Sequence, residues 1–308
     1  MSKVNHFHTI VRMNNADGIK KPRKRKNQIS GFLYILPALF IALLFSYRPF
    51  VKTIINSLSI VNYSGTIIDV AGLDNFKRLF ADRNFLTSLT NTFRFAVMFV
   101  PLNLLVCIIL ALLVYRKRKG TAFNESLFIM PLSVAMSSAA IVFQALFNPT
   151  IGVINFLFNV QVQWFNDPKW AMWVIVILCI WMAMGLDFLL LVGALRSIPK
   201  EVLEAAELDG SNRLQTFFHI QIPLISPTLM FVIANRLRDS MLLSGPVLVM
   251  TEGGPFRSTQ TLVYQMYVEG FKSGNYSMGS AISVIVFLLS LAMIAVSFRF
   301  ERKGVFYQ

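Results

Sequence analysis

The chain has 308 residues, of which 55% are hydrophobic and only 14% are charged, and its net charge is +14. A soluble domain carries about 25% charged residues, so this composition argues against a soluble enzyme. The 28 phenylalanines argue against a disordered chain, and the two cysteines cannot form a disulfide framework. The composition is typical of a polytopic membrane protein.

Six stretches are long and apolar enough to cross a bilayer, whose hydrocarbon core of about 30 Å needs roughly 20 helical residues. They cover residues 31–46, 89–115, 125–147, 170–195, 222–250 and 278–298. The first is expected to stay helical past Pro49 towards Leu58. We therefore predict an all-α membrane protein with six transmembrane helices in one domain over 30–303. A basic tail at 1–29 precedes this domain and a short tail at 304–308 follows it.

The distribution of Lys and Arg predicts the orientation of these spans. If the N-terminus is cytoplasmic, the inside segments hold 18 basic residues and the outside segments hold 6. Cytoplasmic loops carry such an excess, so both termini are expected in the cytoplasm. The basic run at 20–26 resembles a nucleic-acid patch, but directly before a membrane helix it is better explained as an anchor to anionic headgroups. No nucleic-acid partner is expected.

Three outer segments have helical or aromatic patterns. Residues 74–82 alternate apolar and polar positions at helical spacing. Residues 153–164 are apolar but too short to span, so we expect a helix lying on the outer face. Residues 264–271 are rich in aromatic side chains. Each segment is either a docking surface for an outer partner or a site of interfacial packing.

The polar loop between the fourth and fifth spans has signals for two short helices. Ser197 can cap a helix, Pro199 fits a first turn, and Glu201 complements the positive end of the helix dipole. Gly210 can adopt the left-handed conformation that ends a helix, and Ser211 can then cap a second one. We expect these two helices, joined at a glycine, on the cytoplasmic face.

The same loop resembles the EAA motif of bacterial ABC-importer permease subunits. Glu-Ala-Ala is followed after three residues by Gly and after nine more by Ile-x-Ile-Pro, where the family pattern ends in Leu-Pro. The resemblance implies a coupling helix that sits in a cleft of a separate ATP-binding subunit. The coupling residues that it assigns are Glu204, Ala205, Ala206, Gly210, Ile220 and Pro223.

Other segments resemble the carbohydrate-uptake permeases of the maltose and glycerol-phosphate type. These segments are residues 48–59, 73–76, 251–262, 267–271 and 276–281, and the likeness covers about 30–303. It implies a bacterial plasma-membrane protein that works with a second permease, two ATP-binding subunits and an extracytoplasmic solute-binding protein. The implied solute is an oligosaccharide or a sugar derivative.

The sequence lacks the motifs of nucleotide and metal sites. No G-x-x-x-x-G-K-[ST] loop occurs, and His6, His8 and His219 are isolated from one another. We expect a non-catalytic chain with no catalytic residue, metal or cofactor of its own. ATP and Mg²⁺ would bind to the partner subunits.

Polar side chains inside the spans are costly and tend to line cavities. They are Arg94, Asn103, Gln144, Asp187, Asn235, Arg236, Arg238, Asp239, Ser240 and Ser244. Asn235, Arg238 and Asp239 share one helical face, and with Ser244 they are the predicted substrate pathway. The alternatives are an Arg238–Asp239 ion pair, and an Asp187 that pairs with an arginine or lies at a subunit interface.

Two other classes of function compete with the importer. A secondary transporter would work alone on an ion gradient and would show inverted repeats with broken helices, and no convincing repeat is present. A membrane-anchored signalling or nucleic-acid protein would use the basic tail, but it would not need six spans with polar residues inside them.

Overall fold

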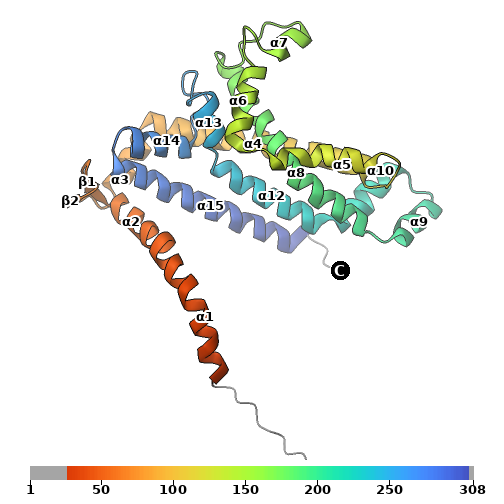
Figure 1. The fold of residues 1–308 in the computed structure, drawn as a ribbon, viewed down its shortest axis with the longest axis horizontal. Helices are drawn as coiled ribbons and strands as arrows, with labels where there is room; N and C mark the ends of the chain where they lie inside the picture. Colours follow the sequence, from red (N-terminus) through yellow and green to blue (C-terminus); the bar gives the residue numbers. More distant parts are fainter. Residues whose placement is uncertain (1–25, 305–308) are drawn as a thin grey trace, which may run out of the picture. The chain divides into compact units, whose positions relative to one another are not determined.

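The computed structural model describes residues 26–304, and these are mostly helical (Figure 1). The chain divides into two compact units, residues 1–51 and residues 52–308. The greater part of the predicted basic tail, residues 1–25, and residues 305–308 of the predicted C-terminal tail lie outside the described residues.

The first unit contributes the start of one long helical segment. Helix α1 (Lys26–Ala42) continues through the π-helical turn η1 (Leu43–Tyr47) into α2 (Arg48–Ser57). The candidate span within it is Leu33–Ser57, so the helix does continue past Pro49 as predicted.

Four helices pack together in the second unit. Helix α4 (Arg83–Val114) contacts both α8 (Pro168–Ser197) and α12 (Ser226–Met241), and α12 also contacts α15 (Tyr276–Gly304) (Figure 1). Two apolar clusters fill the contact between α4 and α8. One is built around Phe95 and Met172, and the other around Cys107 and Phe188. These clusters leave a short stretch between them, where the polar residues of the candidate site lie.

Shorter elements connect the long helices. The antiparallel strands β1 (Ser59–Val61) and β2 (Ile67–Val70) form a hairpin. Helix α3 (Asp74–Ala81) follows, and it confirms the helical pattern of residues 74–82. The remaining elements are α5 (Thr121–Ile129), η2 (Met130–Ser133), α6 (Met136–Leu146), α7 (Val153–Phe158), α9 (Lys200–Leu208), α10 (Arg213–Thr216), η3 (Phe217–Gln221), α11 (Ile222–Leu224), α13 (Gly245–Met250), α14 (Leu262–Tyr267) and η4 (Val268–Lys272).

Two of the predicted spans are not single helices. Residues 121–146 form two helical pieces that meet at a bend of 105°, and residues 213–241 form two that meet at 71°. The prediction of one continuous helix over 125–147 and another over 222–250 is therefore wrong. The latter is further divided where α12 ends and α13 begins.

Prolines explain these breaks. Pro131 lies in the 3₁₀ turn η2, after which Val134 and Ala135 are extended. Pro227 and Pro246 occupy the first turns of α12 and α13. Backbone N–H groups in a first turn have no acceptor within the helix, so a proline there costs no hydrogen bond. Each of them therefore permits a new helix to begin and prevents the previous one from continuing.

The described residues contain four helices that are long and apolar enough to cross a membrane, and six spans if each bent pair counts as one. The four are Leu33–Ser57, Arg83–Val114, Pro168–Ser197 and Tyr276–Arg299. The fold is thus that of an all-α membrane protein, and the number of spans lies between four and six.

A close approach of two glycines yields a prediction about stability. A Cβ atom on Gly279 of α15 would lie 2.8 Å from the Cα atom of Gly270 in η4, so the backbones must separate to admit it. We expect Gly279→Ala to lower the midpoint of thermal unfolding, although alanine stabilises a helix by about 1 kcal/mol over glycine. The matched control is Gly193→Ala in α8, where a Cβ atom meets nothing within 4 Å. Equal midpoints for the two variants would contradict this packing.

Candidate functional site

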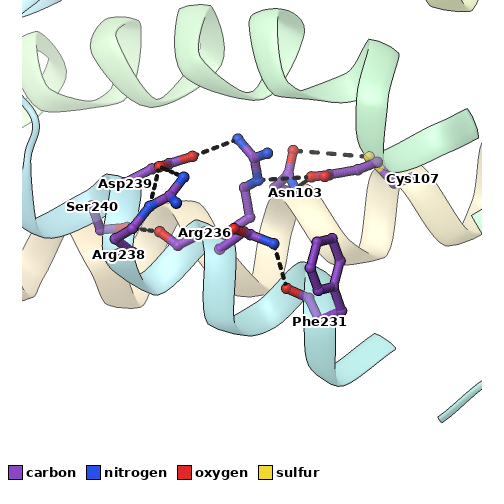
Figure 2. A network of polar contacts seen from close by, with 9 residues as sticks. Asn103, Cys107, Phe231, Arg236, Arg238, Asp239 and Ser240 are labelled. Atoms are coloured by element: carbon purple, nitrogen blue, oxygen red, sulfur yellow. Dashed lines mark hydrogen bonds and ion pairs between the residues drawn. The ribbon is translucent and has the colours of Figure 1, made fainter. Parts of the chain in front are cut away.

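A buried carboxylate joins three helices at the centre of the second unit. Asp187 of α8 is only 1% exposed. Its Oδ2 atom accepts a hydrogen bond of 2.6 Å from Nδ2 of Asn103 on α4, and Nε of Arg236 on α12 lies 3.1 Å away (Figure 2). Asn103 also accepts from the thiol of Cys107, at 3.8 Å. The network therefore ties α4, α8 and α12 together between the two apolar clusters.

The network continues along α12 to a second carboxylate. Nη1 of Arg236 lies 2.9 Å from Oδ2 of Asp239, and Nη2 of Arg238 lies 2.8 Å from Oδ1 of the same side chain (Figure 2). Two arginines thus face two aspartates, and their formal charges cancel. A buried charge needs such partners because desolvation of an unpaired one costs several kcal/mol.

The side chains of this network differ in their access to solvent. Arg236 is 12% exposed, Asp239 35% and Arg238 47%. Asp187 is thus the buried end of the network, and Asp239 and Arg238 form the accessible end.

The structure separates the residues of the predicted substrate pathway. Asn235 donates to the carbonyl of Phe231 one turn earlier in its own helix. Arg238 pairs with Asp239, which the alternative interpretation expected. Asp239 and Ser244 line a cavity, whereas neither Asn235 nor Arg238 is among its lining residues. Whether any of them contacts a solute stays a prediction.

Arg236 was among the polar residues found inside the predicted spans but was not assigned to the substrate pathway, and its contact with Asp187 confirms the alternative in which Asp187 pairs with an arginine. The choice of one helical face, at spacings of three and four from Asn235, excluded Arg236. A signal was present in the sequence, because Arg236 precedes Asp239 by three residues and Asp187 needed a cation inside the membrane.

The cavity has a volume of about 370 Å³ and lies beside the charged network. Its polar side chains are Arg236, Asp239 and Ser244. The rest of its wall is made by Phe95, Phe99, Met136, Cys179, Met182, Ala183, Leu242, Leu243, Gly245 and Pro246. A few polar groups in a mostly apolar wall are typical of small-molecule sites.

The loop with the resemblance to the EAA motif forms two short helices, α9 and α10, as predicted. Gly210 is left-handed with φ of +78°, and Glu201 lies in the first turn of α9. The predicted caps are wrong in detail. Pro199 is itself the N-cap of α9, and Ser197 ends α8.

The cap of α10 is a second correction. Asn212, rather than Ser211, caps this helix through a reciprocal pair of hydrogen bonds with Gln215. The Ser211 hydroxyl instead lies 2.8 Å from that of Thr216. An amide side chain competes well for this position, and the glutamine three residues later completes the capping box.

The predicted coupling residues lie mostly on the surface of this loop. Glu204, Ala205 and Gly210 are exposed, Ile220 and Pro223 are partly exposed, and Ala206 is buried. Four large apolar side chains of the loop are also exposed, namely Val202, Leu208, Leu214 and Phe218. The loop thus presents a mixed acidic and apolar surface that nothing in the described chain covers.

Polar contacts join the ends of the long helices where this loop begins, and one exposed ion pair reaches the loop itself. Arg196, at the end of α8, donates to the carbonyls of Val114 (2.9 Å) and Tyr115 (3.1 Å) and pairs with Glu125 of α5. Those carbonyls end α4 and would otherwise lack partners. Arg116 lies 3.8 Å from Glu207 of α9. These contacts place α9 beside the end of α4, and they join the ends of α4, α5 and α8 to one another.

The described residues contain no group of three or more His, Cys, Asp and Glu side chains that could hold a metal ion. The two aspartates of the network are occupied by arginines.

A family model described as "binding-protein-dependent transport system inner membrane component" matches residues 103–303. The chain belongs to this family. The matched region begins at Asn103 of the network and includes the two-helix loop, nearly all of α15 and the residues that line the cavity except Phe95 and Phe99. The relatives of this family member are permease subunits, so the chain is a transport protein of a bacterial inner membrane rather than an enzyme.

Curated relatives and solved structures agree with this assignment. The chain is 33% identical to the sn-glycerol-3-phosphate transport system permease protein UgpA of Yersinia enterocolitica, over 90% of this chain and 95% of the relative. It is also 33% identical to UgpA of Escherichia coli, over the same shares. A chain of a bacterial ABC transporter involved in the import of the acidic polysaccharide alginate has the same fold, with a TM-score of 0.79 at 20% identity. That match covers 90% of this chain and 96% of the other.

The charged network yields a prediction about stability. Asp187→Ala removes the more buried of the two carboxylates that face Arg236, so we expect the free energy of unfolding to fall by about 3–5 kcal/mol. Replacing both partners, as Asp187→Leu with Arg236→Met, should recover most of the loss because no buried charge remains. The measurement is the thermal midpoint of the detergent-solubilised protein.

The control is Asp74→Ala, which breaks an exposed ion pair with Lys77 of 3.1 Å and should change stability by less than about 1 kcal/mol. If Asp187→Ala behaved like this control, the network would have no structural role.

Proposed function

We propose that the chain is a permease subunit of an ATP-driven ABC importer for an oligosaccharide or a sugar derivative. It would form the pathway with a second, homologous permease. Two ATP-binding subunits would carry ATP and Mg²⁺ below the membrane, and an extracytoplasmic binding protein would deliver the solute above it. The observation that carries the proposal is the exposed two-helix loop, with its Glu-Ala-Ala sequence and its left-handed Gly210, in a chain of this family.

The proposed topology has six spans, counting each bent pair as one, with both termini in the cytoplasm. The excess of Lys and Arg in the two tails and in the segments at 116–124 and 196–221 supports this orientation. It puts the two-helix loop on the side where ATP-binding subunits are found. The acidic surface of the loop would then meet a partner rather than the anionic headgroups.

The proposed mechanism is alternating access. Closure of the ATP-binding subunits would displace α9 and α10, and two routes lead from them into the membrane. One is the Arg116–Glu207 contact to the end of α4. The other is the chain itself, which runs from α10 through η3 and α11 directly into α12, where Arg236 and Asp239 lie. Displacement of the loop would thereby change the walls of the cavity.

A secondary transporter is the alternative function. The two bent helix pairs are also compatible with the broken helices of secondary transporters. Membership of a binding-protein-dependent transport family argues against a secondary transporter. A transporter driven by an ion gradient would also leave the exposed acidic loop without a partner.

The coupling residues are tested with two variants. Gly210→Pro fixes φ near −65° and removes the N–H that donates to the carbonyl of Glu207 (3.1 Å). Glu204→Lys reverses an exposed charge of the loop. We expect ATP-dependent uptake to fall roughly 5- to 150-fold, the range of coupling free energies of about 1–3 kcal/mol, while the protein still inserts in the membrane.

Gly120→Pro is the matched control, because Gly120 is also left-handed (φ +90°), with open space around it, but lies outside the motif. It should keep most of the uptake. Normal uptake in both loop variants would overturn the assignment of the coupling residues.

A further inference from the structure

The formal charges beside the cavity cancel one another through three ion-pair contacts, although Oδ1 of the buried Asp187 accepts no hydrogen bond. Asp239 uses Oδ2 for Arg236 and Oδ1 for Arg238, and Arg236 also faces Asp187. With two arginines and two aspartates, the group is neutral. An anion that entered the cavity would find no spare cation, and it would meet the carboxylate of Asp239 directly in the wall.

An anion would have to compete with Asp187 and Asp239 for the guanidinium of Arg236. The guanidinium is held against Asp187, which is itself fixed by the 2.6 Å hydrogen bond from Asn103. Taking Arg236 away would leave Asp187 as an unpaired, buried carboxylate, which is strongly unfavourable. Asn103 and Asp187 therefore act as positioning residues that keep Arg236 paired at the edge of the cavity.

Arg238 does not offer an alternative. It is not among the residues that line the cavity, and its Nε and Nη2 atoms both donate to Oδ1 of Asp239, at 3.2 Å and 2.8 Å. An anion could use Arg238 only by separating it from Asp239.

The accessible groups suit a hydroxylated ligand. Asp239 offers carboxylate oxygens as acceptors, Arg236 offers N–H donors, and Ser244 can do both. The apolar part of the wall includes the rings of Phe95 and Phe99, which stack with centroids 5.2 Å apart. A sugar ring has hydroxyls at its edge and C–H groups on its faces, so it complements both kinds of wall.

We propose that this cavity binds a neutral polyhydroxylated solute, such as an uncharged sugar unit, through Asp239, Arg236 and Ser244, and that it excludes anions. The inference rests on the proposed function and narrows its class of substrate. It differs from what the names of the relatives suggest, because glycerol 3-phosphate and alginate are both anionic.

The test uses the complete transporter, with both permeases and both ATP-binding subunits, in lipid nanodiscs without the binding protein. The neutral probes are maltotriose and raffinose, and the anionic probes are sn-glycerol 3-phosphate and trigalacturonate. Binding is measured as a ligand-dependent rise in the thermal midpoint. We expect at least one neutral probe and neither anion to bind to the unaltered complex.

Asp239→Asn removes one negative charge and leaves the cavity wall with a net positive charge. It should weaken binding of the neutral probe by roughly tenfold or more, since hydrogen bonds to charged groups are the stronger class, and it should create binding of the anions. Asp74→Asn makes the same chemical change in an exposed ion pair and should alter neither. Ser244→Lys adds a cation to the wall without removing a member of the network, so it keeps the test decisive if Asp239→Asn fails to assemble.

Binding of either anion to the unaltered complex, failure of both neutral probes, or no gain of anion binding in the variants would overturn the inference. Its failure is distinct from failure of the proposed function. ATP-dependent uptake of an anionic solute would leave the importer intact and exclude a neutral-solute cavity. Absence of any ATP-binding partner would overturn the importer itself.

Discussion

The pairing of Arg236 with two aspartates holds the centre of this structure together. The interior of a bilayer offers no water to a charge, so a guanidinium there must carry its own counter-ions. Arg236 finds them in Asp187 of α8 and in Asp239 of its own helix, while Asn103 of α4 orients the first. Three helices are thereby held in one arrangement at a position where apolar packing is interrupted.

The same pairing lies on a helix that is bounded by two breaks of the fold. Helix α12 has 16 residues and is about 24 Å long at 1.5 Å per residue, which is shorter than the hydrocarbon core. It begins after the bend at residue 225 and ends before α13, so it is a separate piece between the two-helix loop and the cavity. Under the proposed function, displacement of the two-helix loop would move this short helix together with the carboxylates that pair with Arg236.

The sequence was most informative about features that depend on neighbouring residues or on hydrophobicity averaged over a long segment. Long apolar runs are visible in any window, so the four long spans and the extension past Pro49 were predictable. Gly210 and the acidic first turn of α9 follow from backbone preferences and the helix dipole. The prolines at 131, 223 and 227 were equally visible, but membrane helices often tolerate proline, and composition alone does not say which proline bends its helix.

The candidate site was less predictable because it depends on partners distant in sequence. Asp187 and Arg236 are brought together by the packing of α8 on α12, which no periodicity within one helix reveals. The alternative of an ion pair between the adjacent Arg238 and Asp239 is confirmed, but helical spacing could not show that Asn235 turns back onto its own backbone. The choice of Asn212 over Ser211 as a cap depends on a one-residue difference in where α10 begins.

The proposed role of the two-helix loop is best tested by labelling and cross-linking Ser211→Cys in intact cells and in isolated membranes. The two native cysteines are buried, so the introduced thiol is the accessible one among the described residues. We predict that a membrane-impermeant maleimide does not label it from outside, while the exposed Ser273→Cys is labelled. We also predict that a short cross-linker joins Ser211→Cys to an ATP-binding subunit. Labelling of Ser211→Cys from outside, or a complex without such a subunit, would contradict the proposed coupling.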